Sequence, residues 1–153
     1  MPVSREDMET VCIEQQLRIE AEPEQVYRAL TVDIDSWWTH RFSSNGSTVS
    51  LEPVIGGRFQ ESFAGGGGAL YGVVSYVDPD HRLTIRGPMG MRGAVASVIT
   101  LDLEASGTGT IVSLSHRAIG EVSAEEGDEY SSGWSNLLTL ALKPFVEDRH
   151  ATV

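Results

Sequence analysis

The chain has 153 residues, 41% of them hydrophobic, which suits one folded domain with a single core and argues against disorder. Its 22 acidic and 11 basic residues give a net charge of -11, which favours solubility and repels phosphate backbones. We therefore expect a soluble protein that does not bind nucleic acid.

The sequence also argues against membrane, disulfide-linked and metal-binding proteins. No apolar run approaches the roughly 20 residues of a membrane-spanning helix, and the acidic stretch 1–10 is unlike a signal peptide. Cys12 is the one cysteine, so no internal disulfide forms, and the histidines lack the spacing of a metal site. We expect a cytoplasmic protein with no membrane partner, no metal and no cofactor.

The first predicted elements are one strand and two short helices. Residues 1–9 are interpreted as a frayed leader. Val11 to Ile19 then alternates apolar and polar residues as a half-buried strand does, with Gln15 on the apolar face. Pro23 suits the first turn of a helix, and a second short helix is predicted from Asp35 to about His40.

The middle of the chain is predicted to form strands separated by turns. Glycine pairs, Asp-Pro-Asp and Ser-Gly-Thr-Gly are turn signals, and the segments between them alternate in hydrophobicity. The six predicted strands are Val49–Leu51, Phe59–Phe63, Leu70–Val77, Arg82–Arg86, Val95–Leu103 and Val112–Ala118.

A long helix is predicted from Ser123 to Glu147. Ser123 and Glu126 have the spacing of a capping box. Pro144 lacks the N–H that the helix needs, so we expect a kink or an end near Lys143, followed by a tail at 148–153. One apolar face at helical spacing runs through Tyr130, Trp134, Leu137, Leu138, Ala141 and Phe145.

These elements predict an α+β fold. An antiparallel sheet of alternating strands needs a cover for its apolar face, and the terminal helix is the segment with the broadest apolar stripe. A curved sheet wrapped around one helix leaves a space between them in which a ligand can bind.

The order of motifs resembles the START-like, helix-grip superfamily (SRPBCC). The branch it is most similar to is that of the small bacterial homologues of the activator of the heat-shock-protein-90 ATPase. The match covers about residues 11–147 and rests on the order and spacing of several motifs. The motifs are Ala21–Leu30 running into Ser36-Trp37-Trp38, then Gly56-Gly57-Arg58-Phe59, Gly72 before Val73-Val74, Asp78-Pro79 before Arg82-Leu83, and Gly133-Trp134 before Leu137, Leu138 and Leu142.

This resemblance implies one START-like domain over residues 1–153. Its fold would be a seven-stranded curved antiparallel sheet gripping the terminal helix, with two short helices after the first strand and a cavity inside. It does not imply one function, since the superfamily contains carriers, cyclases, receptors and co-chaperones. No catalytic residue is carried over. The chain departs from the usual pattern at Gly65–Gly68 and at the Gly87–Gly93 connection, and we expect both departures to reshape the mouth of the cavity.

The candidate ligand site consists of residues that share the inward parity of their strands or the inward face of the helix. Its apolar members are Phe59, Phe63, Ile99, Leu101, Leu114, Trp134 and Leu138. Its polar members are Gln15, Glu61, Ser97 and His116. Met89 and Met91 are candidates for a soft apolar lip at the entrance.

Three interpretations of the polar members stay open. They bind the polar end of a ligand, they bond one another and the backbone as ordinary buried groups, or Glu61 and His116 carry out acid–base chemistry. The matching functions are binding of a small, mainly apolar molecule, a polyketide-cyclase-like or dehydratase-like reaction, and a co-chaperone-like contact with a heat-shock ATPase. Binding of a small apolar molecule is the function we expect.

Overall fold

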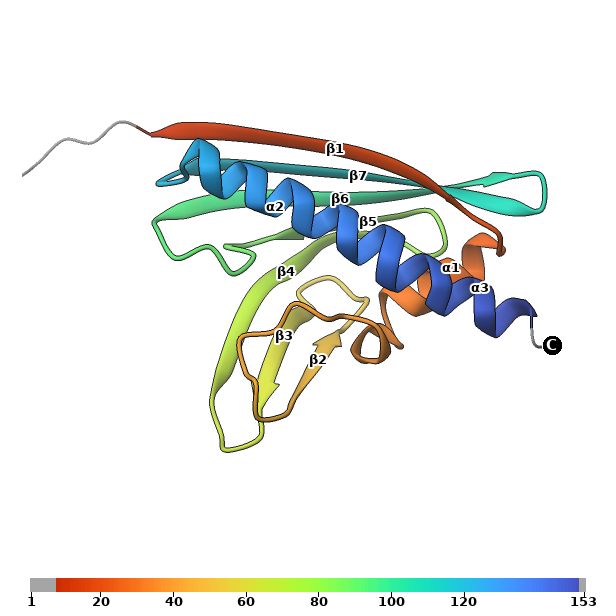
Figure 1. The fold of residues 1–153 in the computed structure, drawn as a ribbon, viewed down its shortest axis with the longest axis horizontal. Coiled ribbons are helices and arrows are strands. Elements are labelled where there is room, and N and C mark those ends of the chain that lie inside the picture. Colours follow the sequence, from red (N-terminus) through yellow and green to blue (C-terminus); the bar gives the residue numbers. More distant parts are fainter. Residues whose placement is uncertain (1–7, 152–153) are drawn as a thin grey trace, which may run out of the picture.

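The computed structural model describes residues 8–151, so most of the predicted leader and the end of the tail lie outside it. Seven antiparallel strands form one curved sheet in the order β1-β7-β6-β5-β4-β3-β2 (Figure 1). The strands are β1 (Glu9–Ile19), β2 (Ser47–Leu51), β3 (Arg58–Phe63), β4 (Gly68–Asp78), β5 (Arg82–Arg86), β6 (Val95–Ser106) and β7 (Gly109–Gly120).

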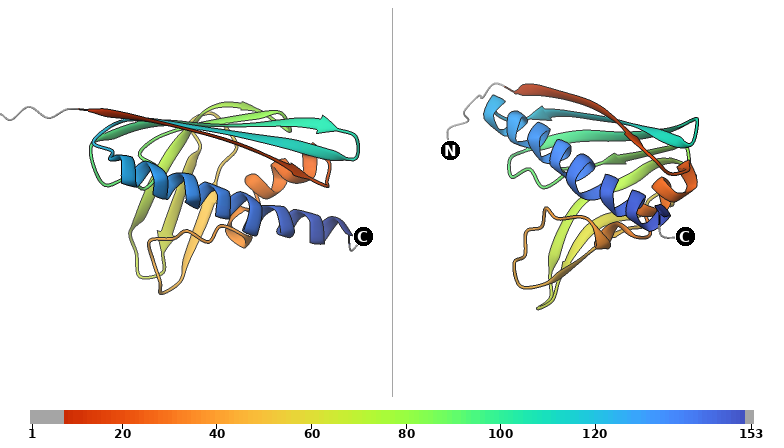
Figure 2. Two further views of the ribbon diagram at one scale, coloured as in Figure 1. Left: turned by 45° about the horizontal axis from the view of Figure 1, so that its top comes forward. Right: turned by 45° about the vertical axis from the view of Figure 1, so that its right-hand side comes forward.

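The helices lie on one side of this sheet. A long terminal helix crosses it, and α1 lies near the end of that helix (Figure 2). The helical elements are α1 (Pro23–Leu30), the 3-10 turn η1 (Ile34–Ser36), α2 (Ala124–Asn136), the π-helical segment η2 (Leu137–Leu142) and α3 (Lys143–Ala151). This is the predicted α+β, helix-grip fold. None of the helices in the described part of the chain is long and apolar enough to cross a membrane.

The terminal helix begins where the sequence predicted and continues beyond the predicted end. Ser123 Oγ accepts a hydrogen bond from the backbone N–H of Glu126 at 3.0 Å. The helix does not end at Pro144. Instead the turn before the proline widens to π-helical bonding, with the Lys143 N–H donating to the carbonyl of Leu138. A wider turn accommodates a residue that has no N–H and a bulky ring, so the helix continues to Ala151.

Three predicted boundaries near the ends and the tryptophans are corrected. β1 begins at Glu9, inside the predicted leader, and α3 takes up most of the predicted tail. The predicted helix from Asp35 to His40 is only a 3-10 turn that ends at Ser36. Beyond it the Trp37 indole N–H donates to the carbonyl of Ala29 at 2.7 Å, which draws this ring into the core and ends the helix.

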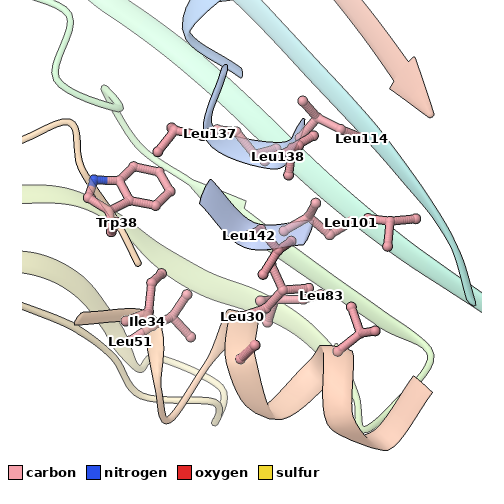
Figure 3. Close-up of a cluster of buried hydrophobic side chains, with 14 of the residues drawn as sticks. Leu30, Ile34, Trp38, Leu51, Leu83, Leu101, Leu114, Leu137, Leu138 and Leu142 are labelled. Carbon is pink, nitrogen blue, oxygen red and sulfur yellow. The ribbon is translucent and has the colours of Figure 1, made fainter. Parts of the chain in front are cut away.

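The core fills the space between the sheet and the terminal helix. Leucines of η2 meet Leu83, Leu101 and Leu114 of the strands, and Trp38 and Ile34 close the cluster from the α1 side (Figure 3). The strand residues alternate in burial along β6 and β7, as period-2 patterning predicts.

Candidate functional site

An open cleft of about 450 Å³ lies between α2, β4, the loop after η1 and the β5–β6 connection. Its walls are largely aromatic, and a few polar groups stand among them. The aromatic lining residues are Trp38, Phe42, Tyr71, Tyr130 and Trp134. The polar lining residues are His40, Arg41 and Glu129.

The wall formed by residues 40–43 is held from behind by a buried carboxylate. Glu61 is 1% exposed and accepts hydrogen bonds from the backbone N–H groups of Phe42 and Ser43 at 2.8 and 2.9 Å. It also accepts from the Tyr71 hydroxyl at 2.8 Å. Burial raises the pKa of Glu61, but these donors outweigh it and the pKa lies below its ordinary value. An ionised Glu61 therefore ties the loop to β3 and β4.

Arg41 fixes the same wall from its other side. Its guanidinium donates to three backbone carbonyls, those of Trp38, Ser47 and Asp35, at 2.7–2.9 Å. It also pairs with the Asp35 carboxylate at 2.9 Å. Because most of its donors are already used within the protein, Arg41 shapes the cleft more than it offers a free charge to a ligand.

Two tyrosines line the cleft with their hydroxyls bound to protein groups. The Tyr130 hydroxyl donates to the carbonyl of Met89 at 2.8 Å, which ties the β5–β6 connection to α2. Burial, aided by the charges of Glu126 and Glu129, raises the pKa of Tyr130 to about 12. Burial and the bond to Glu61 raise the pKa of Tyr71 as well. Both phenols therefore stay protonated near neutral pH.

His116 lies directly behind the cleft wall. It is 1% exposed, and its ring meets the rings of Tyr130 and Trp134 edge-on. Its Nδ1 accepts a hydrogen bond from the Trp134 indole N–H at 2.9 Å. Its Nε2, which therefore carries the proton of the neutral ring, has no bonding partner among residues 8–151. Burial lowers the pKa of His116 from 6.5 to about 4.

The stability of the protein should fall on mild acidification because of His116. In the unfolded chain the imidazole takes up a proton below about pH 6.5, whereas in the folded chain it does so only near about pH 4. The unfolded state thus binds more protons than the folded state between these two pH values. The free energy of unfolding should therefore fall by about 2 kcal/mol from about pH 7 to about pH 5. Urea unfolding followed at both pH values measures this loss.

The matched variant for this measurement is His116→Gln. Its amide oxygen can accept the Trp134 N–H, and it does not titrate. In His116→Gln the free energy of unfolding should change much less with pH than in the wild type. The control is His81→Gln, at an exposed position, which should lose stability on acidification as the wild type does. Equal sensitivity in the wild type and His116→Gln would rule out His116 as the cause.

The structure places the predicted apolar site residues mainly in the core. Trp134 lines the cleft, and Met89, a predicted lip residue, does too. Met91 packs instead in a small separate cluster. Phe63 is half-buried and Leu114 is buried away from the cleft. Four predicted members, Phe59, Ile99, Leu101 and Leu138, surround a cavity of only about 20 Å³.

The predicted polar residues are inside or half-buried, but they do not form one cluster. Gln15 donates to the carbonyl of Ser131 at 2.7 Å, and Ser97 donates to the carbonyl of Gly87. Glu61 and His116 bond different partners and support the cleft from behind. A direct role of any of these four in ligand contact stays a proposal.

Sequence reasoning missed the loop and β4 residues of the cleft. His40 was predicted as the end of a short helix, Arg41 and Phe42 were assigned to no element, and no face was assigned to Tyr71. The available signal was the close spacing of Trp37, Trp38 and Phe42 in the sequence. In the structure the Phe42 ring stacks on the Tyr71 ring, with 5.9 Å between the ring centroids.

A curved sheet gripping one long helix, with an aromatic cleft beside that helix, defines a START-like helix-grip protein. Residues 20–147 match the family model described as Activator of Hsp90 ATPase homolog 1-like protein, and the chain belongs to this family. No protein with a curated functional description matches the sequence.

Solved structures of bacterial proteins have the same fold. The Aha1 dimer from Colwellia psychrerythraea is 26% identical with a TM-score of 0.64, over 90% of this chain and 96% of that chain. A protein from Rhizobium leguminosarum is 19% identical with a TM-score of 0.69, over 93% and 97% of the two chains. One from Chromobacterium violaceum is 20% identical with a TM-score of 0.66, over 89% and 96%. The last two show likeness of fold alone.

Proposed function

We propose that this protein binds a small, mainly apolar molecule in the aromatic cleft. The observation that supports this is the cleft itself, whose volume of about 450 Å³ and aromatic walls are typical of small-molecule sites. Trp134, Tyr130 and Phe42 supply apolar contact, and the exposed carboxylate of Glu129 and the ring of His40 supply polar contacts. Glu61 and His116 contribute by holding the walls in place.

The cyclase-like or dehydratase-like alternative has less support. The Glu61 carboxylate already accepts three hydrogen bonds, which lower its pKa and its readiness to take a proton. Neither Glu61 nor His116 lines the cleft. A general acid or base has to come within hydrogen-bonding distance of its substrate.

Filling the cleft should abolish binding without harming the fold. Gly133 lies on α2 and lines the cleft, and a Cβ placed there would come no closer than 3.4 Å to the His40 ring. Gly133→Leu should therefore occupy ligand space, remove no existing contact, and gain helix propensity. We expect it to weaken binding of the naphthalene probe ANS by about tenfold or more, at unchanged or higher melting temperature.

The control is Ser132→Leu, which adds the same side chain at the neighbouring exposed position. It should bind ANS as the wild type does. Native mass spectrometry of freshly purified wild type should also show a retained small molecule that Gly133→Leu lacks. Equal binding by Gly133→Leu and wild type would contradict a ligand site in this cleft.

A second candidate function is contact with a heat-shock ATPase, as the family description suggests. The structure offers an exposed apolar surface outside the cleft for such a contact. Val54 and Ile55, in the β2–β3 turn, are 55% and 68% exposed. The next residue, Gly56, bonds the carbonyl of Val74 beside the exposed Val73, so the three side chains belong to one region.

This second function is tested by the ATPase rate of purified Hsp90 with and without the protein. The wild type should raise the rate, Ile55→Asp should not, and Gly133→Leu should still do so because it leaves this surface unchanged. No change of rate with the wild type would exclude this candidate and leave the ligand-binding proposal untouched.

A further inference from the structure

The sheet has two edge strands, and they differ in how well they are covered. At the edge formed by β2, the Val49 N–H donates to the Asp35 carboxylate at 2.8 Å, and β2 is only five residues long. At the other edge, β1 is eleven residues long and pairs with β7 along its whole length. An uncovered strand edge is a template for pairing with another strand.

The terminal helix covers the end of the β1 edge and leaves the rest open. Lys143 Nζ donates to the carbonyl of Arg18 at 2.6 Å, and the Glu147 carboxylate accepts from the Glu20 N–H at 2.8 Å. These even-numbered residues therefore direct their backbone groups away from β7. Backbone direction alternates along a strand, so the same holds for the even-numbered residues before them. These residues are Thr10, Cys12, Glu14 and Gln16.

We propose that this open edge pairs with the same edge of a second copy of the chain. In an antiparallel pair the outward-directed residues face one another, and the centre of the open stretch is Ile13. A two-fold axis at Ile13 sets Thr10 opposite Gln16 of the second copy and Cys12 opposite its Glu14. Each open N–H and carbonyl then finds a partner.

The side chains on this edge suit a second copy. In this register Glu14 faces a cysteine and not another Glu14, which avoids a like-charge pair. α2 packs on the inner face of β1, where Gly127 is buried against Val11 and Gln15 donates to the carbonyl of Ser131. These contacts use the inward side chains of β1 and leave its outward backbone groups uncovered.

Pairing at β1 yields a closed dimer. A two-fold contact uses the same patch on both copies, so it does not propagate by itself. The β2 edge is short and bonded to Asp35, so it offers little for further addition. None of the four edge residues lines the cleft, so the dimer does not depend on ligand binding.

Sedimentation equilibrium of the wild type should give a dimer, more stable at high salt because salt screens the repulsion between two chains of net charge -11. Glu14→Pro removes one outward N–H without breaking the ladder to β7, so it should be a folded monomer. Glu14→Thr keeps that N–H and should remain a dimer. A monomeric wild type, or a dimeric Glu14→Pro, overturns the proposal.

Cross-linking tests the register and does not depend on tolerance of proline. Facing residues that exchange both backbone hydrogen bonds have Cα atoms about 5.5 Å apart, within reach of a disulfide. Mild oxidation should therefore link most of Glu14→Cys into covalent dimers through Cys12 of the other copy. Wild type and Ser115→Cys, whose new thiol lies one strand inward, should stay unlinked. Absence of covalent dimers in Glu14→Cys overturns the proposal.

Discussion

Replacing Trp134 with alanine should lower the free energy of unfolding by about 3–5 kcal/mol. Its ring is 6% exposed and meets Trp38 edge-on at 5.9 Å, so its removal opens a cavity where the terminal helix packs on the core. The change also leaves Nδ1 of the buried His116 without its donor. For a chain of this size the melting temperature should fall by about 10 °C or more.

Two variants separate the causes of this loss. Trp134→Phe keeps most of the apolar ring but cannot donate to His116, so it should lose about 1–3 kcal/mol. Leu140→Ala, on the same helix at a position 70% exposed, should cost less than about 0.5 kcal/mol. A melting temperature for Trp134→Ala equal to that of the wild type would mean that the terminal helix does not complete the core.

Replacing Glu61 with alanine should cost about 3–5 kcal/mol and release the loop that forms one cleft wall. The change leaves two loop N–H groups without their acceptor, and each unsatisfied buried donor costs about 1–3 kcal/mol. The Tyr71 hydroxyl also loses its bond to Glu61 and keeps only the His40 carbonyl, at 3.3 Å. Amide exchange at Phe42 and Ser43 should become much faster, and ANS binding in the cleft should weaken. Hydrogen-exchange mass spectrometry and urea unfolding measure the two effects.

The control for Glu61 is Glu52→Ala. The Glu52 carboxylate also accepts a backbone N–H, that of Arg58, but it is exposed to solvent, so water can replace it and the loss should stay below about 1 kcal/mol. Because the pKa of Glu61 is lowered by folding, its contribution is present above the unfolded value of 4.5 and is lost as the pH falls through the folded value. Glu61→Ala should lack this acid transition.

The sequence by itself determined the order of the elements and the inward faces of the regular ones. β6 and β7 pair without a bulge from Val95 to Ser106, so strict alternation correctly assigned Ile99, Leu101 and Leu114 to the interior. Helical spacing did the same for Trp134 and Leu138. In these segments the periodicity of the backbone alone decides which side chains are buried.

Irregular segments limited the prediction of the cleft. β4 is bulged against β3 at Tyr71, since Phe59 pairs with Gly72 and Gln60 with Leu70, so Tyr71 and Val74 are both buried although alternation would separate them. The loop that carries Phe42 is positioned by Glu61, which lies 19 positions further along the chain. Neither a bulge nor a contact between residues 19 positions apart produces a periodic pattern of apolar residues that could be recognised in the sequence.

The location of open space was decided only by the tertiary structure. Inward parity correctly predicted an apolar interior between the sheet and the terminal helix, but side chains from η1, η2 and the strands leave only about 20 Å³ there. The cleft of about 450 Å³ opens instead beside α2, where loops held by Glu61, Arg41 and Tyr130 meet. Local patterns say which side chains point inward, whereas the volume left after packing depends on the shapes of side chains from every element at once.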